Sequence, residues 1–203
     1  MSDRDAIAII GHACRLPGGV TSPESLWQLL VDQRDAVTEI PAERWDRGQF
    51  LNPGRIAGKA YTQNAGILED VAGFDAAFFG LSPREAEQMD PQQRILLQLT
   101  WEALEDAGIR PSTLAGTDVG VFIGASQTDY AHQFFADYAI ADSHFATGTS
   151  LAVLANRISY AYDLHGPSVT VDTACSSSLV ALNHAVEAFS SGRVDTAIVG
   201  GIH

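Results

Sequence analysis

The sequence predicts a layered α/β fold. Three short apolar runs end in glycine, at residues 6–11, 119–124 and 197–201, and such runs are typical of strands that are buried on both faces. Segments with clear helix start signals lie between them. Residues 167–201 have the order strand, helix, strand, which indicates a right-handed parallel crossover. This alternation favours a sheet with helices on its faces.

The first third of the chain is predicted to contain a strand, a helix and an irregular segment. The strand is the run 6–11, and the helix begins after Ser22-Pro23, because a serine cap followed by proline favours a helix N-terminus. Residues 34–66 combine scattered proline, glycine and tryptophan. We expect them to form an ordered surface excursion and not a linker.

Two further helices are predicted to begin at Ser82-Pro83 and at Asp90-Pro91. The second is the longest in the chain, and its apolar side chains cover more than one stripe before Gly108 ends it. It should therefore be packed on most of its sides. Its role is expected to be architectural.

The second half of the chain is predicted to contain alternating strands and helices. Strands are expected at 119–124, 167–173 and 197–201, and helices at 147–161 and 179–190. The strand at 167–173 differs from the others because apolar and polar residues alternate in it. One of its faces should therefore meet a less apolar surface.

Charge and hydropathy argue against several classes of protein. The 203 residues include 12 Lys and Arg against 25 Asp and Glu, for a formal net charge of −13. Nucleic acids and anionic membrane surfaces need basic side chains to neutralise their phosphates, so neither is an expected partner. No apolar run approaches the roughly 18 residues of a spanning helix, and residues 1–5 lack the apolar core of a signal peptide. We therefore expect a cytoplasmic protein.

Cysteine usage narrows the candidate site. Cys14 and Cys175 are too few for a disulfide framework or a C-x-x-C metal site, so no metal is expected. Cys175 follows a predicted strand where the chain turns into a helix, and α/β proteins place their ligand sites there. The unpaired N–H groups of a first helical turn stabilise a thiolate, and they can also stabilise the oxyanion of a thioester under attack. The position therefore suits acyl transfer.

A structural interpretation of Cys175 is equally open from position alone. The thiol could fill a gap in the core while Thr173 or Ser176 caps the following helix. Asp172 mildly favours this interpretation, because a carboxylate facing the sulfur would disfavour a thiolate. Strand alternation should, however, turn that carboxylate elsewhere.

A family resemblance decides between the two interpretations. Residues 172–179, Asp-Thr-Ala-Cys-Ser-Ser-Ser-Leu, resemble the nucleophile motif of type I β-ketoacyl synthase domains, which occur in modular polyketide synthases and animal-type fatty acid synthases. Further stretches are similar to the same family, in order and over the whole chain: 7–11, 13–19, 74–80, 82–86, 89–94, 101–108 and 156–160. Residues 65–68, Ala-Gly-Ile-Leu, depart slightly from the Gly-Gly-Phe expected there, which concerns local packing only.

The resemblance implies a fold, a reaction and partners. The fold would be thiolase-like, layered α/β/α/β/α, with residues 1–203 as its amino-terminal half. An acyl group would pass from the phosphopantetheine thioester of an acyl carrier protein to Cys175, whose N–H would be an oxyanion donor. A malonyl-type extender would then lose carbon dioxide and attack the acyl thioester. Because the phosphopantetheine belongs to the carrier, no cofactor is expected. The expected partners include a second copy of the complete domain, in a homodimer, and other synthase domains.

The family's condensation step relies on two histidines far downstream of the nucleophile, which are expected to lie beyond residue 203. The chain alone is therefore expected to be an incomplete enzyme. A lone histidine is more often structural or solvated than catalytic. We accordingly expect no replacement among the six present: His12, His132, His144, His165, His184 and His203.

Two secondary features are expected to be structural. Cys14 matches a family position without a catalytic role and should lie in the core. Arg44, Arg47, Arg55 and Lys59 gather a third of the basic residues into one stretch. That stretch could meet an acidic carrier protein, but a solvated surface is the favoured interpretation.

Other functions stay open at this point. The chain could be a truncated scaffold that dimerises or binds a carrier protein without catalysis. It could also be a free-standing cysteine acyltransferase or hydrolase, which would need a base within these residues. In the family's non-condensing relative, the chain-length factor, the nucleophile is replaced, so the retention of Cys175 argues against that relative.

Overall fold

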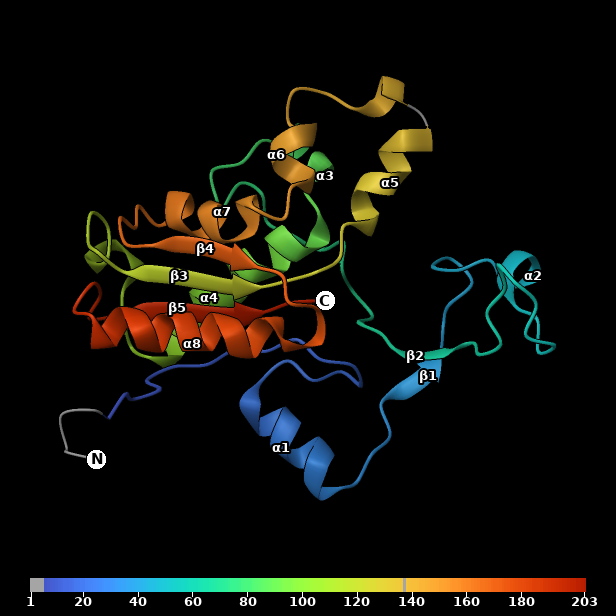
Figure 1. Ribbon diagram of the computed structural model, residues 1–203, viewed down its shortest axis with the longest axis horizontal. Helices are drawn as coiled ribbons and strands as arrows, with labels where there is room; N and C mark the ends of the chain where they lie inside the picture. The colour runs from blue at the N-terminus through green and yellow to red at the C-terminus, as the bar shows by residue number, and fades with distance from the viewer. Residues whose placement is uncertain (1–5, 137) are drawn as a thin grey trace. The chain divides into compact units, whose positions relative to one another are not determined.

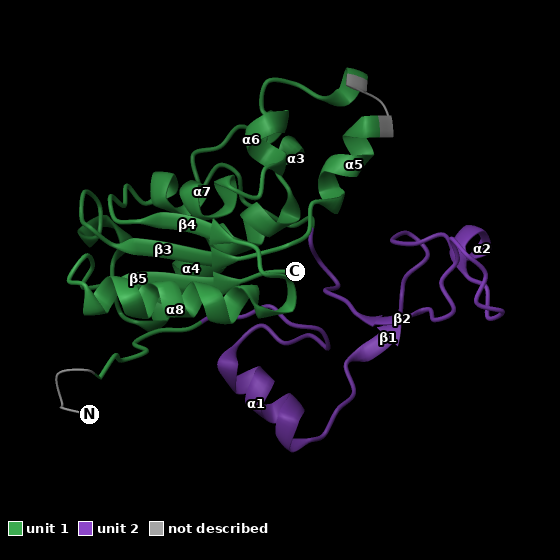
Figure 2. Cartoon of the chain, in the orientation of Figure 1, with its two compact units in different colours: residues 1–12, 72–203 green, residues 13–71 purple. Residues whose placement is uncertain are grey.

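The computed structural model describes residues 6–136 and 138–203, and it divides the chain into two compact units (Figure 2). We call residues 1–12 and 72–203 the core unit, and residues 13–71 the excursion unit. Residues 1–5, where the sequence lacks the apolar core of a signal peptide, lie outside the described residues. No helix in the described ranges is long and apolar enough to cross a membrane.

The core unit is built around a parallel three-stranded sheet with the order β4-β3-β5 (Figure 1). The strands are β3 (Gly120–Gly124), β4 (Ser168–Val171) and β5 (Ala197–Gly201). Every residue of the central strand β3 is buried, because neighbours cover both its edges and both its faces. The predicted strands at 119–124, 167–173 and 197–201 are therefore confirmed within three residues at each end.

Helix α8 (Ser177–Ser190) covers one face of this sheet (Figure 1). Its contact face is a row of alanines, Ala181, Ala185 and Ala188, which pack around Phe122 of β3. Small side chains at this spacing bring the helix backbone close to the strands. The order β4, α8, β5 confirms the predicted parallel crossover.

The opposite face is covered by α4 (Pro91–Asp106) and α7 (Val153–Ala161). Leu97, Leu154 and Ile158 form its core with Val121 and Ile123 of β3. Seven residues of α4 are buried, including polar ones, so the prediction that it is packed on most sides is confirmed. The preceding helix α3 (Pro83–Gln88) and α4 both begin at the predicted caps, with side chains of Ser82 and Asp90 accepting backbone N–H bonds.

The alternating strand β4 meets a polar helix surface, as predicted. The Thr170 hydroxyl accepts a hydrogen bond from the N–H of Ala155, 3.1 Å away, and thereby satisfies a donor in the first turn of α7. The hydroxyls of Ser168 and Ser159 lie 2.8 Å apart. Val169 is 40% exposed at this edge of the sheet.

The single helix predicted over residues 147–161 is wrong. The structure has two helices, α6 (Phe145–Thr149) and α7, with an extended residue at Ser150. Two carbonyls near the break accept tertiary bonds: Gln93 Nε2 donates to Thr147 and Gly148, and the Asp90 N–H donates to Gly148. Because these donors belong to another helix, α4 and its N-cap, local propensity does not reveal them. The core unit also contains the 3₁₀ turns η2 (Pro111–Thr113) and η3 (Tyr138–Ile140) and helix α5 (Asp129–Ala136).

The strand predicted at 6–11 is also wrong. This segment joins no sheet among the described residues, and Ile9 is 87% exposed. A strand needs a neighbour for its N–H and C=O groups, and the segment is instead held at its end on α4. There a Cβ on Gly11 would lie 2.3 Å from the Ala103 carbonyl oxygen, and His12 bonds to Asp106.

The excursion unit confirms that residues 34–66 are ordered. It contains α1 (Pro23–Val31), β1 (Val37–Glu39), α2 (Arg47–Phe50) and β2 (Asn64–Gly66). The two strands pair antiparallel, with Val37 opposite Gly66. Helix α1 begins at the predicted cap, where Ser22 and Ser25 bond reciprocally.

Candidate active site

Cys175 lies in a tight turn between β4 and α8, which we call the Cys175 turn (residues 172–178). A 3₁₀ segment, η4 (Ala174–Ser176), links the strand to the helix. Helix α8 then begins at Ser177, two residues before its predicted start. Cys175 is a free, exposed cysteine at the carboxyl end of the strand, which is the predicted position.

The backbone of the turn is bent at Ala174, which has φ of +55°. A residue with a Cβ is disfavoured there, so other contacts must hold it. One of them comes from Asp172, whose Oδ1 accepts a hydrogen bond of 2.9 Å from the N–H of Ala174. That carboxylate oxygen is therefore committed to the backbone of the turn.

Hydroxyl groups inside the turn complete its hydrogen bonds. Ser177 Oγ accepts from the N–H of Thr173 at 2.9 Å and donates to the carbonyl of Ala174 at 2.7 Å. Ser176 Oγ donates to the Thr173 carbonyl at 2.9 Å. Neither Thr173 nor Ser176 caps a helix with its side chain, so the capping role proposed for them is wrong. Within the described residues, the Cys175 N–H has no acceptor and is available as a donor.

Two strand-ending glycines let the start of α8 approach the sheet. A Cβ on Gly124 would lie 2.4 Å from the Ser177 carbonyl carbon and from the Ser178 nitrogen. A Cβ on Gly201 would lie 2.6 Å from the Cβ of Ser178. The sequence pattern identifies these glycines only as strand ends. Their position at the ends of β3 and β5 is the signal that marks the site's edge of a parallel sheet.

Two histidines of the core unit are paired with aspartates away from the Cys175 turn. His12 bonds to Asp106 Oδ2 through its backbone N–H at 2.9 Å, and its Nδ1 lies 2.8 Å from the same oxygen. These bonds, the backbone one above all, lower the pKa of Asp106 below its ordinary value. His165 Nε2 lies 3.0 Å from Asp163 Oδ1.

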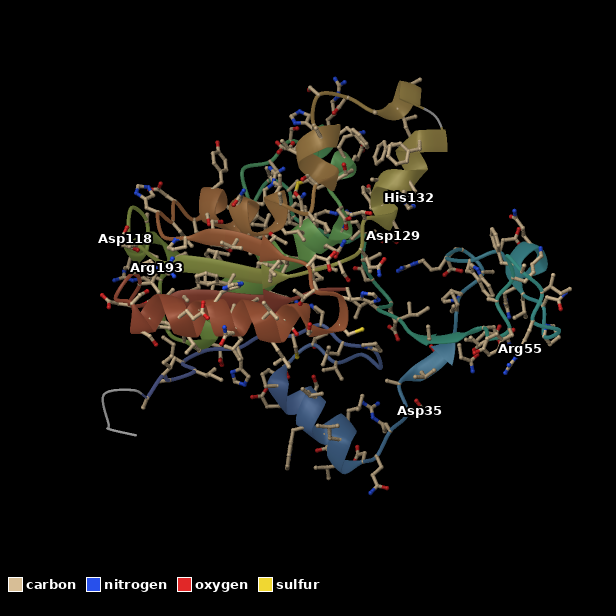
Figure 3. All side chains as sticks on the ribbon, viewed as in Figure 1. Asp35, Arg55, Asp118, Asp129, His132 and Arg193 are labelled. Carbon is tan, nitrogen blue, oxygen red and sulfur yellow. The ribbon has the colours of Figure 1, made fainter. Side chains whose placement is uncertain are left out.

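Three other histidines contact residues outside the Cys175 turn. His132 lies on α5 (Figure 3), with its ring centroid 5.9 Å from that of Phe135. His144 Nδ1 is 4.0 Å from Glu85, which pairs with Arg157. His184 Nδ1 is 3.6 Å from Glu187 on α8, and His203 is exposed. No histidine among the described residues pairs with a residue of the Cys175 turn.

The secondary features in the excursion unit have local partners. Cys14 is half-buried and belongs to neither hydrophobic core cluster of the described residues, so the expectation that it lies in the core is wrong. The four clustered cations, one of which is labelled in Figure 3, are engaged with neighbours: Arg44 with the Leu68 carbonyl, Arg47 with Glu39, Arg55 with the ring of Tyr61, and Lys59 with the Gln49 carbonyl. These contacts favour the interpretation as a structured, solvated surface.

The arrangement of the turn suits nucleophilic attack on a carbonyl carbon. An exposed thiol precedes a helix N-terminus that no side chain caps, and its own N–H can donate to a developing oxyanion. No group of three His, Cys, Asp or Glu side chains is placed to bind a metal ion in the described parts of the chain.

Iodoacetamide at neutral pH is expected to alkylate Cys175 at least about tenfold faster than Cys14 in the folded protein, because only Cys175 is exposed at a helix start. Peptide mass mapping of a time course measures both rates. In denaturant, the two cysteines should react alike. Preferential labelling of Cys14 in the folded protein would overturn the assignment.

Comparisons with known sequences identify a family match over almost the whole chain. Residues 4–203 match the family described as "Beta-ketoacyl synthase, N-terminal domain". The 6-methylsalicylic acid synthase of Penicillium terrestre is 50% identical over 200 residues, which is 98% of this chain and 11% of that protein. The pikromycin polyketide synthase component PikAII of Streptomyces venezuelae is also 50% identical over 200 residues, 98% of this chain and 5% of its own length.

Solved structures agree with this match. The oxazolomycin ketosynthase domain OzmH KS7 of Streptomyces albus JA3453 superposes with a TM-score of 0.87 at 41% identity, over 96% of this chain and 34% of that one. The ketosynthase from module 6 of the bacillaene synthase of Bacillus subtilis 168 gives a TM-score of 0.82 at 37% identity, over 97% and 31%. The chain thus spans about a third of the solved ketosynthases and about a tenth or less of the curated synthases.

Proposed function

The chain belongs to the β-ketoacyl synthase family, with a thiolase-like α/β fold, and we propose that residues 1–203 are the nucleophile-bearing part of a polyketide synthase ketosynthase domain. The observation that carries the proposal is the Cys175 turn. It places an exposed thiol and an unused backbone N–H side by side at the carboxyl edge of a parallel sheet.

In the first proposed step, the Cys175 thiolate attacks the carbonyl carbon of an acyl group carried as a phosphopantetheine thioester on an acyl carrier protein. The tetrahedral oxyanion accepts a hydrogen bond from the Cys175 N–H. The bond to the phosphopantetheine sulfur then breaks, and that thiolate takes up a proton as it leaves. The acyl group is now a thioester of Cys175, and the reaction has used no cofactor of this chain.

In the second proposed step, a malonyl-type extender loses carbon dioxide, and the resulting carbanion attacks the carbonyl carbon of acyl-Cys175. A carbon–carbon bond forms, the carbon–sulfur bond breaks and the Cys175 thiolate is regenerated. Decarboxylation of the extender, and stabilisation of the negative charge that develops on it, need positioned acid–base groups. Because no described histidine contacts the Cys175 turn, we propose that these groups come from the remainder of the ketosynthase domain.

The exposed face of α8 supports a domain that continues beyond these layers. Leu179, Leu182 and Val186 form a stripe on this helix with exposed fractions of 69%, 47% and 38%. An apolar stripe of this kind on a central helix is normally covered. We propose that the remaining part of the domain covers it and completes the layers α/β/α/β/α.

A complete ketosynthase domain is expected to be a homodimer. β4 is an edge strand with Val169 exposed, and an edge of this kind can pair with its symmetry mate across an isologous interface. Val169→Lys should shift the dimer towards monomer, while Val31→Lys, at an exposed valine of α1, should not. Light scattering over a concentration series measures both. A wild-type monomer at every concentration would contradict the proposal.

The function is tested with the complete ketosynthase domain, an acyl thioester and a malonyl-loaded carrier protein. Mass spectrometry of the intact domain and its peptides should first show the acyl group on Cys175. β-Ketoacyl product should then appear on the carrier. If acyl groups accumulate on another residue, the proposal fails because Cys175 is not the nucleophile. If Cys175 is acylated but hydrolysis replaces condensation, the proposal also fails, and a free-standing cysteine hydrolase becomes the better interpretation.

A further inference from the structure

Ser177 is the most buried hydroxyl in the Cys175 turn, with an exposed fraction of 5%. Its oxygen accepts from the N–H of Thr173 and donates to the carbonyl of Ala174. The hydroxyl therefore binds the two residues that precede Cys175. It spends its only hydrogen on that bond, so it is not itself a nucleophile in this geometry.

These bonds span the strained point of the backbone. Ala174 has φ of +55°, and the residues on either side of it would relax towards a regular helical or extended conformation if nothing held them. The Ala174 carbonyl also accepts the Ser177 N–H, but the Thr173 N–H is bound by the Ser177 hydroxyl alone among the described residues. Removing the hydroxyl would leave that donor without its partner and release one side of the turn.

We propose that Ser177 is a positioning residue for acyl transfer: its hydroxyl holds the strained turn in the geometry that presents the Cys175 thiol and N–H to the same carbonyl group. This inference rests on the proposed function of Cys175. The thiol must reach the carbonyl carbon while the N–H reaches the oxygen, and both depend on the backbone angles at Ala174. Asp172 supports the same turn from the other side through the Ala174 N–H.

The proposal separates two reactions of the same thiol. Acyl transfer needs the thiol and the oxyanion donor in one geometry, whereas alkylation by iodoacetamide forms no oxyanion and needs only an accessible thiolate. In the complete ketosynthase domain, Ser177→Ala should slow acylation of Cys175 roughly 10- to 100-fold. Alkylation should stay within about twofold of wild type. The substitution should lower the maximal rate of acylation and leave KM for the acyl carrier unchanged, because the oxyanion forms only after the thiolate has attacked.

Two other variants keep the test decisive. Ser190→Ala is the matched control, because Ser190 is an exposed serine at the far end of α8, outside the Cys175 turn, and its hydroxyl likewise donates to a backbone carbonyl, that of Val186 at 2.9 Å; the variant should acylate at the wild-type rate. Asp172→Ala removes the opposite support and should show the same split as Ser177→Ala, so it carries the test if the latter variant does not fold.

The outcomes are distinguishable. The positioning role is overturned if Ser177→Ala acylates within twofold of wild type, or if acylation and alkylation fall by the same factor. An unchanged acylation rate in Asp172→Ala would count against it in the same way. If the wild-type domain forms no acyl-Cys175 at all, the proposed function fails, which is a different result from failure of the positioning role.

Discussion

Replacing Cys175 by alanine is expected to abolish condensation by the complete ketosynthase domain, with a fall in turnover of at least about 10³-fold. Both proposed steps pass through the thioester of this residue. The neighbouring hydroxyls of Ser176 and Ser177 donate to backbone carbonyls, so neither offers a free nucleophile. The thiol is exposed, so the free energy of unfolding should change by no more than about 0.5 kcal/mol.

Cys14→Ser is the matched control for this variant. Cys14 is the other free cysteine, and it lies in the excursion unit. Its substitution should leave acyl loading and condensation at the wild-type rates. Product formation by mass spectrometry and thermal unfolding of each variant separate a lost nucleophile from a lost fold. Steady β-ketoacyl production by Cys175→Ala would refute the assignment of the nucleophile.

Gly124→Ala is expected to destabilise the core unit by about 3 kcal/mol. The added Cβ would lie 2.4 Å from the Ser177 carbonyl carbon and the Ser178 nitrogen, and 2.6 Å from the Ser177 carbonyl oxygen. All three are backbone atoms, so the clash is relieved only by moving the start of α8 away from β3.

Gly200→Ala is the matched control because Gly200 also lies in the sheet, on β5. Its added Cβ would lie 3.1 Å from Ile123 Cδ1 and 3.6 Å from Leu96 Cδ2, which are the ends of flexible side chains. We expect a cost under about 1 kcal/mol. Chemical denaturation of the complete domain measures both variants. Equal stabilities for the two would show that the approach of α8 to β3 does not depend on Gly124.

Most of the regular elements in the core unit are predictable from sequence because their signals are local. The caps at Ser82 and Asp90 act within three residues, and each helix begins where its cap predicts. The fully apolar run of β3 identifies a strand covered on both faces. The position of Cys175 between a strand and a helix is predictable in the same way, since both neighbours have strong periodic patterns.

The elements that the sequence misassigns depend on partners far along the chain. Residues 6–11 have the composition of a buried strand, but a strand exists only where another backbone accepts its hydrogen bonds. The helix expected over 147–161 is interrupted because Gln93, more than fifty residues away, binds the carbonyls of Thr147 and Gly148. Neither the lack of a neighbouring strand for residues 6–11 nor the contact with Gln93 can be predicted from the local sequence.

The sequence by itself determined the layered α/β class, the strand–helix crossover and the residue that carries the thiol. Only the tertiary structure decided the shape of the Cys175 turn: the positive φ of Ala174, the use of Asp172 and Ser177 as its supports, and the close passage of Gly124. The physical reason is the distance along the chain over which each kind of interaction acts. Caps and periodic patterns act over one or two turns of chain, whereas a strained turn exists only when the strands and helix around it outweigh its cost.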